Sequence, residues 1–473
     1  MPAFDFRYSR PYGSASRWTN GRADPNATPP ETERAQQLQV SGIEIGVIGL
    51  IALLSAVALG IDTVLALGVT GLVGLVAVVG AEPSSPGLEA IFEEMAHHFS
   101  VSIVLFLFMG QLALRGGLAE DLFQALSGWL PRIHGGIAAS TAFAAAVLGP
   151  GSGSSAATSA GIARIALPGM ISAGYDRRLA SASVAMGSLV SSLLPTSSLL
   201  VLFAILTGTD VAKLAVSGTV PAMLLAALCC VTTIILLRRR PALAPVVKLP
   251  AMRERLMRLG IAGPLLLLAL FVMAGLASGL LSPLLAGLVG TGGMLVLAVA
   301  RQALRPKASA SALAAAIARQ TAYAIAGALA ALVFNRFLAV SGIPELVRAS
   351  LASFPADGWL VVGLIACLDL LLGAILEPVA LLAVMLPPTL PIVTHLGFEP
   401  SWYGVFTILL IEIGAILPPI GRNCEAIQSS SGAMVRADDV FNGLSPYLLC
   451  ALAVVIAVAL FPALVQVLPV NLF

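Results

Sequence analysis

Two short polar stretches interrupt apolar segments of this chain and place cation-binding groups where a membrane would lie. The first reads Gly149-Pro-Gly-Ser-Gly-Ser-Ser155, and the second reads Leu372-Gly-Ala-Ile-Leu-Glu-Pro378. Serine hydroxyls, a glutamate carboxylate and carbonyls freed from helical pairing are oxygen ligands that suit Na⁺. Helix N-termini beside such breaks carry partial positive charge and suit anionic groups. These residue types therefore indicate a site for a cation and an anionic substrate.

This pattern occurs twice, with a constant offset of 223 positions. After the first stretch come Leu167-Pro168, Gly174-Tyr-Asp176 and Leu194-Pro195, and after the second come Leu390-Pro391, Gly397-Phe-Glu399 and Leu417-Pro418. The offset aligns Ser154 with Glu377, and Pro195 with Pro418. Paired interruptions of this kind indicate the binding site of a transporter built from repeats. The alternative is a chance match, because Leu, Pro and Gly are common in this chain.

The composition excludes an ordinary soluble protein. Apolar residues make up 58% of the chain and charged residues 11%, with a mean hydropathy of +0.97. A soluble domain carries roughly 25% charged residues. Many windows reach the roughly 20 apolar residues that a membrane-spanning helix needs, and they do not alternate like the strands of a membrane barrel. The sequence therefore predicts an all-α polytopic membrane protein.

Basic residues predict which loops face the cytoplasm. The loop at 238–258 contains six arginines and one lysine, and a second basic loop follows two crossings later at Arg301. The loop at 81–96 contains glutamates but no Lys or Arg, as suits the outer face. Segment 43–80 is long enough for two crossings or for a single broken one. The charges leave both arrangements open, and with them the side on which the N-terminal tail lies.

Counting crossings from these loops gives the two repeats opposite orientations. We expect a re-entrant hairpin at 135–172 to enter from the cytoplasm, and a second at 358–394 to enter from outside, with Glu377 near its tip. Each hairpin is followed by a broken helix, at 179–207 and at 401–430. Non-helical backbone at this depth is tolerated only where protein buries it or where it lines a wet cavity. The two tips and the two breaks are therefore predicted to converge near the midplane.

Scaffold segments flank these inverted repeats. The predicted order is a disordered tail at 1–42, scaffold helices at 43–130, the first transport repeat at 131–211, scaffold helices and amphipathic arms at 212–340, the second transport repeat at 341–430 and a C-terminal scaffold helix at 431–473. The tail is polar and lacks the apolar region of a signal peptide. The arms, 250–259 and 309–320, are typical either of helices lying on the inner membrane surface or of plain interfacial linkers.

Carboxylates within apolar segments are functional candidates, because a charge inside a bilayer is costly. Glu377 has the strongest claim, since it aligns with Ser154. Glu412 precedes the second break, where it either binds a ligand or holds unwound backbone amides. Asp369 lies two turns before the second tip and is expected to be structural, paired with a neighbouring helix.

Arg422 directly follows the second break. It either grips a substrate carboxylate with its two parallel N–H groups, or it extends to the membrane surface or neutralises a nearby glutamate. The serines at 152–155 either bind ligands or, being small, permit close helix packing. Arg164, three turns beyond the first tip, has a weaker claim to a substrate role.

At these residues the chain resembles the DctM-like large membrane subunit of tripartite ATP-independent periplasmic (TRAP) transporters. Similar to the family's patterns are Ser152-Gly-Ser-Ser-Ala156, Ile165-Ala-Leu-Pro168, Gly174-Tyr-Asp176, Gly373-Ala-Ile-Leu-Glu-Pro378, Gly397-Phe-Glu-Pro400, Glu412-Ile-Gly414 and Pro418-Pro-Ile-Gly421. Val190 and Leu194 stand where the family has Gly and Pro, and Arg422 where it has an apolar residue. The resemblance implies an elevator-type secondary transporter of the ion transporter superfamily, with inverted repeats, two re-entrant hairpins and two broken helices.

The resemblance also implies a function and a set of partners. Such a protein imports organic acid anions, such as C4-dicarboxylates or sialic acid, with Na⁺ as coupling ion and no cofactor. It receives them from a periplasmic binding protein and works with a separate small four-helix membrane subunit in the bacterial inner membrane. No nucleic acid is involved.

Carried over residue by residue, the resemblance assigns two groups of site residues. The substrate-binding group is Ser154, Ser155, Thr196, Arg422 and Asn423. The Na⁺-binding group is Ser152, Gly153, Ser154, Gly187, Ser188, Gly373, Glu377, Gly414, Pro418 and Gly421.

Two other functions are weighed against this one. A carrier of the same superfamily that needs no binding protein would couple transport to H⁺ through Glu377 or Glu412, or to Na⁺. An intramembrane serine protease would use the Gly/Ser-rich tip, but it needs a general base. The histidines, at 97, 98, 134 and 395, are all predicted near the membrane interfaces. We therefore expect a transporter and not an enzyme.

Overall fold

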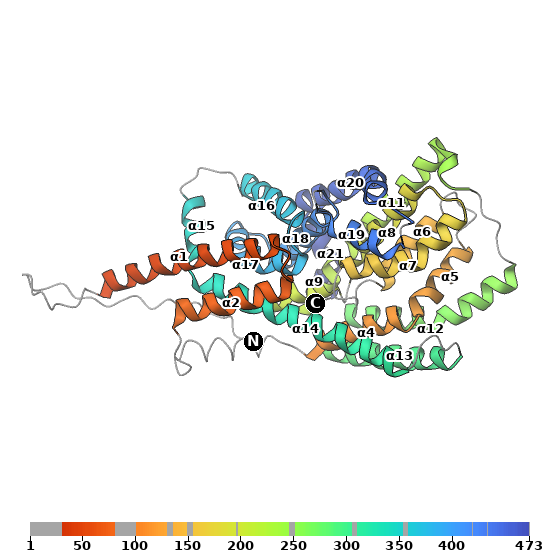
Figure 1. Cartoon of the computed structure of the whole chain (residues 1–473), viewed down its shortest axis with the longest axis horizontal. Coiled ribbons are helices and arrows are strands. Elements are labelled where there is room, and N and C mark those ends of the chain that lie inside the picture. Colours follow the sequence, from red (N-terminus) through yellow and green to blue (C-terminus); the bar gives the residue numbers. More distant parts are fainter. Residues whose placement is uncertain are drawn as a thin grey trace, which may run out of the picture.

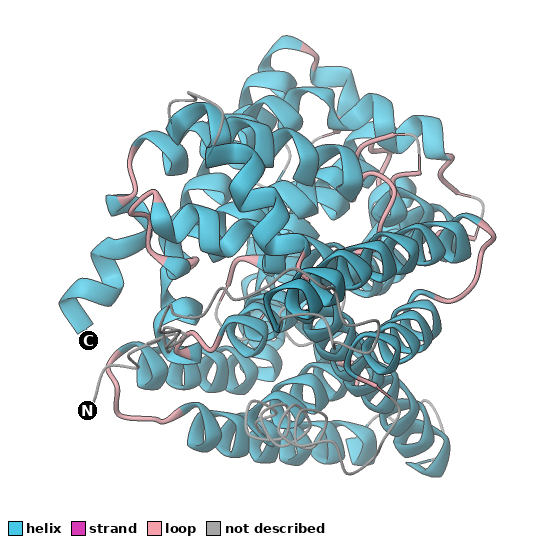
Figure 2. Ribbon diagram, turned by 90° about the vertical axis from the view of Figure 1, so that its left-hand side faces the viewer, coloured by secondary structure: helices cyan, strands magenta, loops and turns pink. Residues whose placement is uncertain are grey.

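A computed structural model of the whole chain describes residues 31–80, 101–129, 136–148, 155–194, 197–245, 251–304, 310–352, 358–418, 420–432 and 434–472. Figure 2 shows that the regular structure of these residues is helical throughout. Within these described ranges, six helices are long and apolar enough to span a membrane. They are Val211–Arg239, Met252–Leu276, Pro283–Arg301, Ala314–Val340, Pro378–His395 and Ala437–Leu460. The prediction of an all-α polytopic membrane protein is confirmed for this part of the chain.

The described helices are given in chain order, and their assignment to scaffold or repeat stays a prediction. The first half contains α1 (Glu31–Ala58), α2 (Thr63–Val79), α4 (Val101–Arg115), α5 (Leu118–Trp129), α6 (Gly136–Leu148), α7 (Ser155–Ser172), α8 (Arg177–Ser192), α9 (Ser198–Thr207), α10 (Val211–Ser217) and α11 (Thr219–Arg239). The second half contains α12 (Met252–Ala277), α13 (Pro283–Leu304), α14 (Ala310–Val340), α15 (Ile343–Ala352), α16 (Gly358–Gly373), α17 (Pro378–His395), α18 (Pro400–Gly414), α19 (Arg422–Ser430), α20 (Ala437–Leu460) and α21 (Ala463–Leu472). Segment 43–80 contains two helices, α1 and α2.

Each predicted hairpin corresponds to a pair of helices separated by a short interruption. The first pair is α6 and α7, and the second is α16 and α17, which pack against each other. The broken-helix segments likewise contain α8 followed by α9, and α18 followed by α19. The first tip, at 149–154, and residues 195–196 of the first break lie outside the described residues. Entry of each hairpin from one side of the membrane stays a prediction.

The core lies around the two helices that precede the breaks. Every residue from Leu179 to Ser192 of α8 and from Ser401 to Gly414 of α18 is buried. Figure 1 shows α8, α18 and α19 surrounded by other helices. α18 carries one carboxylate and few hydroxyls among apolar side chains, so a helix this apolar can be buried on all sides. The residues closest to both breaks are thereby shielded from lipid.

The scaffold helices pack through glycines that receive one aromatic side chain. A Cβ atom on Gly49 of α1 would lie 2.5 Å from the ring of Phe337 of α14, and a Cβ on Gly74 of α2 would also lie 2.5 Å from it. Phe337 is 0% exposed and packs edge-on against Phe334, with ring centroids 5.7 Å apart. The ring therefore fills a slot that only glycines leave open, and it ties α1, α2 and α14 together.

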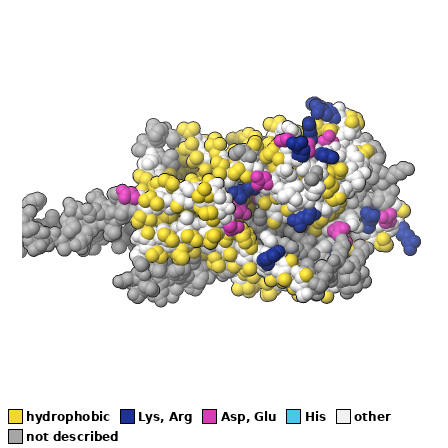
Figure 3. Space-filling view, in the orientation of Figure 1, with side chains coloured by type: hydrophobic (Ala, Val, Ile, Leu, Met, Phe, Trp, Pro, Cys, Tyr) yellow, Lys and Arg dark blue, Asp and Glu magenta, His cyan; other side chains and the backbone are white. Residues whose placement is uncertain are grey.

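Outward-facing side chains of α1 and α2 are strongly apolar. Figure 3 shows apolar atoms covering this end of the molecule, with acidic and basic groups gathered farther along. Exposed residues there include Val47, Ile48, Ile51, Leu65, Val69 and Val73. A surface of this kind suits contact with lipid or with another membrane helix.

A buried ion pair joins α13 to α5. The Arg301 Nε donates to Asp121 Oδ2 at 2.5 Å, and a second guanidinium nitrogen donates to Asp121 Oδ1 at 3.3 Å. The Arg301 and Asp121 side chains are 7% and 6% exposed. Arg301 also donates to the Gly116 carbonyl at 3.3 Å. Arg301, which the sequence assigns to a basic loop, is therefore buried in α13 and ion-paired.

The helix bounds differ from the expected segments at the two amphipathic arms, at the N-terminal tail and at the C-terminal segment. Residues 252–259 and 310–320 are not separate surface helices, because α12 and α14 run on continuously from them. Their Leu, Met, Arg, Glu and Ala residues favour helix, and continuing a helix avoids unpaired end groups. For the same reason α1 begins at Glu31, inside the segment assigned to a disordered tail. The C-terminal segment forms two helices, since the chain breaks at Pro462, which lacks an N–H donor.

Candidate functional site

The first hairpin and the second break meet at a hydrogen bond between Ser155 and Asn423. Ser155 is the first residue of α7, and Asn423 is the second residue of α19. The Ser155 Oγ donates to Asn423 Oδ1 at 3.2 Å, and both side chains are buried. Two predicted substrate residues, 268 positions apart, are thus in contact. This contact joins the two repeats.

Glu412, near the end of α18, lies beside these two side chains. It is 0% exposed, and neither of its carboxylate oxygens has a hydrogen-bond partner among the described residues. The Asn423 Nδ2 is buried there too, also without a partner in that part of the chain. A buried polar atom without a partner costs roughly 1–3 kcal/mol, and a charged one more. The three atoms mark a place where a ligand, water or proton would complete the bonding.

The break after α18 brings Asn423 back toward the end of that helix. α18 ends at Gly414, and α19 begins after Gly421, whose φ of +58° is left-handed and favours glycine. The Asn423 N–H donates to the Ala415 carbonyl at 3.1 Å across the break. Pro418 lies within the break and is exposed. The local turn, rather than a continuous helix, therefore carries the Asn423 amide to Glu412.

The first repeat adds a second pair of hydroxyls to the same face of α7. Ser159 lies one turn after Ser155, and its Oγ donates to the Ser188 Oγ of α8 at 2.8 Å. Next to it, a Cβ on Gly187 would lie 2.6 Å from the Cβ of Ala145 in α6. Gly187 is thus a packing residue that lets α6 and α8 approach. Ser188 is linked to the Ser155 cluster through Ser159.

Gly373 and Gly414 are in direct backbone contact. A Cβ on Gly414 would lie 2.7 Å from the Gly373 Cα, and a Cβ on Gly373 would lie 3.1 Å from the Gly414 Cα. These two predicted Na⁺-binding residues are the last of α16 and of α18. The second hairpin therefore crosses the broken helix where no side chain separates the two backbones, two residues after Glu412.

Glu377 lies apart from this cluster, on the scaffold side of the second hairpin. It is the residue before α17 and is half-buried. With Thr63 of α2, Ala157 of α7 and Tyr323 of α14, it lines a cavity of about 110 Å³. Since Ala157 is three residues beyond Ser154, the start of α7 and the second tip face one cavity. The predicted pairing of Ser154 with Glu377 itself lies outside the described residues.

Arg422 contacts the second tip. Its Nη2 donates to the Ile375 carbonyl at 3.2 Å, so the side chain bridges the second break and the second hairpin. No ion pair of Arg422 with a glutamate is found in the described ranges. The Arg422 Nε is buried and has no partner there. A guanidinium held this way can position the tip and still offer one donor to a ligand.

Asp369 is built into a buried hydroxyl chain, as expected of a structural carboxylate paired with a neighbouring helix. The Thr407 Oγ1 of α18 donates to Asp369 Oδ2 at 2.6 Å. On the same helix, Tyr403 donates to the Thr389 Oγ1 of α17 at 2.6 Å. These bonds hold α16, α17 and α18 together.

Several predicted site residues cannot be placed. Ser152, Gly153, Ser154 and Thr196 lie outside the described residues. The carry-over from the family omitted Glu412 from both groups, although the structure puts it with Ser155 and Asn423. The signal in the sequence was a carboxylate two residues before a glycine that ends a fully apolar helix.

The cluster offers oxygen ligands. Across the described residues, no group of three or more His, Cys, Asp or Glu side chains is placed to hold a metal ion such as zinc. His395 is exposed in the last turn of α17. The arrangement suits reversible binding of a small cation or a proton.

Comparison with known proteins identifies the family. Residues 48–464 match the family model of the DctM component of the tripartite ATP-independent periplasmic transporter. The chain is 27% identical over 409 residues to the C4-dicarboxylate TRAP transporter large permease protein DctM of Pseudomonas aeruginosa, covering 84% of this chain and 93% of that protein. It is 26% identical over 387 residues to the 2,3-diketo-L-gulonate TRAP transporter large permease protein YiaN of Escherichia coli, covering 80% and 88%.

A solved transporter shares the fold. The YdaH transporter of Alcanivorax borkumensis superimposes with a TM-score of 0.54 at 17% identity, over 89% of this chain and 98% of that one. The family model covers most of the sequence and includes both repeats with the Ser155, Glu412 and Asn423 cluster. The chain therefore belongs to the DctM family of TRAP transporter large permease subunits.

Proposed function

We propose that this chain is the permease of a Na⁺-coupled TRAP importer for organic acid anions. Glu412 carries the proposal, as a fully buried carboxylate that faces the Ser155 and Asn423 side chains and pairs with no cation among the described residues. A charge buried in a membrane protein is retained where it pairs with another charge or serves an ion pathway. No basic side chain of the described residues pairs with it.

Na⁺ fits the neighbouring groups better than a proton does. A proton needs one acceptor oxygen, whereas Na⁺ needs several oxygens at once. The Ser155 hydroxyl and the Asn423 carboxamide supply neutral oxygens beside Glu412, and broken helices in transporters commonly supply carbonyls. Gly373 and Gly414, whose backbones meet two residues after Glu412, are the predicted Na⁺ residues closest to the proposed shell.

Substrate class and partners are proposed from the relatives. Both relatives described above are named for the transport of organic acid anions, and both are large permease proteins. We propose the same class of substrate, delivered by a periplasmic binding protein. A separate small membrane subunit and a location in the bacterial inner membrane belong to the same proposal.

The proposal is tested by uptake of radiolabelled succinate into proteoliposomes that contain the chain and its candidate small subunit, with the binding protein outside. We expect an inward Na⁺ gradient to drive uptake. In Glu412→Gln, loss of a charged ligand worth roughly 1.5–3 kcal/mol raises the Na⁺ concentration for half-maximal uptake by about 10- to 150-fold.

Asp369→Asn is the matched control, because it removes an equally buried carboxylate of which one oxygen accepts a hydrogen bond from Thr407, and which lies outside the contact of Ser155 with Asn423. Its Na⁺ dependence should stay near that of the parent. Glu377→Gln tests the other carboxylate of the sequence prediction. Uptake that ignores Na⁺ but follows a pH gradient would favour the H⁺-coupled carrier and overturn the sodium assignment.

A further inference from the structure

Helix α7 presents two different faces to its surroundings. At 3.6 residues per turn, Arg164 lies two and a half turns beyond Ser155 and so points to the opposite side of the helix. Ser155 and Ser159 face α8 and α19, in the cluster with Glu412. Ala157, Ala160 and Gly161 share the side of Arg164. Three small residues on this side leave open space around one long cationic side chain.

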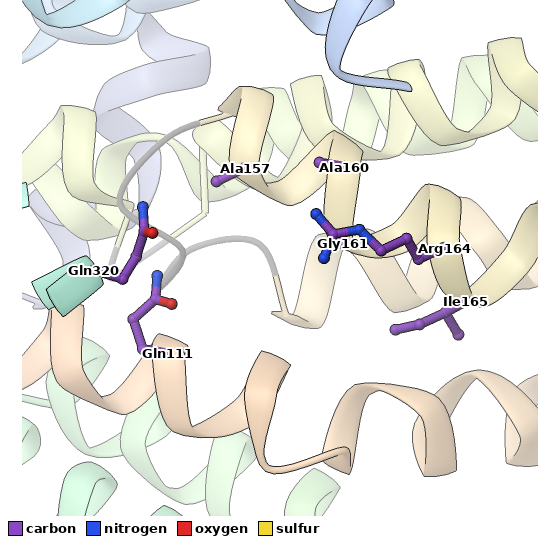
Figure 4. A pocket seen from close by; sticks show the side chains of 7 residues that line it. All are labelled: Gln111, Ala157, Ala160, Gly161, Arg164, Ile165 and Gln320. Atoms are coloured by element: carbon purple, nitrogen blue, oxygen red, sulfur yellow. The ribbon is translucent and has the colours of Figure 1, made fainter. Parts of the chain in front are cut away.

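That open space is a cavity of about 270 Å³ between α7 and the scaffold. Besides the α7 residues, Gln111 of α4 and Gln320 of α14 line it. Figure 4 shows the Arg164 side chain extended along α7 toward Gly161, with the Gln111 and Gln320 carboxamides across the space. This volume is near the lower end of the roughly 300–1,000 Å³ of small-molecule pockets, as suits a small organic ion.

Arg164 places a positive charge at the edge of this cavity, where its side chain is exposed and can reach a ligand, and no carboxylate of the described residues pairs with it. Elsewhere Arg301 pairs with Asp121, and Lys213 pairs with Glu399. For Arg164, no carboxylate lies within ion-pair distance among the described residues. The planar guanidinium can bind a carboxylate through two parallel N–H donors, and the Gln320 carboxamide opposite can donate a further bond.

We propose that this cavity is an oxyanion subsite in which Arg164 binds the carboxylate of a small organic acid, with Gln111 and Gln320 as neutral partners. The substrate class rests on the proposed function, but the subsite lies on the opposite face of α7 from Glu412. The smaller cavity lined by Glu377 shares Ala157 and Gln320 with it, so the two spaces adjoin. An anion therefore has a holding position beside the scaffold, separate from the cation cluster.

The test is equilibrium binding of radiolabelled succinate to the purified full chain in a neutral detergent at fixed ionic strength. Arg164→Gln should weaken binding about tenfold or more, as expected for loss of a charged hydrogen-bond donor. The succinate affinity of Arg164→Lys should lie between those of the parent and Arg164→Gln, because an ammonium keeps the charge but cannot form two parallel hydrogen bonds.

Arg319→Gln is the matched control. Arg319 precedes Gln320 on α14 and is exposed, and it does not line the cavity. Its removal lowers the net charge equally and should leave the affinity within about twofold. An unchanged affinity in Arg164→Gln, or an equal loss in Arg319→Gln, would overturn the subsite.

A phospholipid phosphate could bind Arg164 in the same way as a substrate carboxylate. A second experiment therefore distinguishes lipid from substrate. The chain is placed in nanodiscs of phosphatidylcholine with or without phosphatidylglycerol, and retained lipid is measured for the parent and Arg164→Gln. Phosphatidylglycerol retention that depends on Arg164, without succinate binding, would assign the oxyanion to lipid and overturn the substrate assignment. Succinate binding that persists in Glu412→Gln but is lost in Arg164→Gln would support the subsite even if Na⁺ coupling fails.

Discussion

Replacing Gly414 by alanine should disturb ion binding through a contact between backbones. The added Cβ would lie 2.7 Å from the Gly373 Cα and 2.8 Å from the Gly373 carbonyl carbon. Carbon atoms pack best at roughly 3.5–4.0 Å, so the two helix ends must separate by about 0.8 Å or more. No rotamer change relieves this overlap, because both partners are backbone atoms.

The displacement acts two residues from Glu412. The groups of a binding site must stay within roughly 0.5 Å of their productive positions. In enzymes, a misplacement of about 1 Å can lower the rate on the order of 100-fold. We therefore expect the Na⁺ concentration for half-maximal uptake to rise at least about tenfold in Gly414→Ala. Overpacking should also lower the free energy of unfolding by roughly 1–3 kcal/mol, measured by thermal denaturation in detergent.

Gly363→Ala supplies the control for Gly414→Ala. Gly363 lies on α16, the helix that ends at Gly373, and a Cβ there meets no atom within 4 Å. Its Na⁺ dependence should match the parent, and its stability should rise by up to about 1 kcal/mol from helix propensity. Parental Na⁺ dependence in Gly414→Ala would refute the link between this contact and the cation cluster.

Three further substitutions test the packing around the site. Arg301→Met leaves Asp121 buried and uncompensated, so the free energy of unfolding in detergent should fall by roughly 3–5 kcal/mol; a fall below 1 kcal/mol would contradict the buried ion pair. Gly421→Ala places a Cβ at a φ of +58° and 2.7 Å from the Phe441 ring, so the free energy of unfolding in detergent should fall by at least roughly 1–2 kcal/mol, and an unchanged value would contradict this geometry. Lys213→Ala removes an exposed ion pair with Glu399 and should change the melting free energy by less than about 1 kcal/mol, so a larger loss would show a role beyond that pair.

The sequence predicts the helix ends of the second repeat well, because Gly and Pro impose them. Gly373 and Pro378 bound the second interruption, and Gly414 and Gly421 bound the second break, where the predicted hairpin and broken helix place them. Backbone chemistry of single residues decides these points, and it can be read without knowing the neighbours. The arms could not be assigned from sequence, because polar residues at a helix start look alike whether the helix lies on a membrane or continues into it.

The role of Glu412 could not be read the same way. A carboxylate before a break either holds local amides or faces a distant element, and only the fold decides between them. Its neighbours Ser155 and Asn423 come from different repeats, 268 positions apart. The space around Arg164 also depends on Gln111 and Gln320 from two scaffold helices. The spacing of residues within one helix does not predict contacts with distant segments.

The slot that holds Phe337 has a consequence for how the protein is made. Gly49 and Gly74 are synthesised early, but the ring that fills their slot leaves the ribosome more than 260 residues later. At roughly 5–20 residues per second, α1 and α2 wait on the order of 10–50 s for α14. During that interval the slot beside Gly49 and Gly74 is not filled by Phe337 and is accessible to lipid or to an insertion factor. Completion of the scaffold is thus a late event in biosynthesis, and chains truncated before residue 337 should contain an unfinished α1–α2 hairpin.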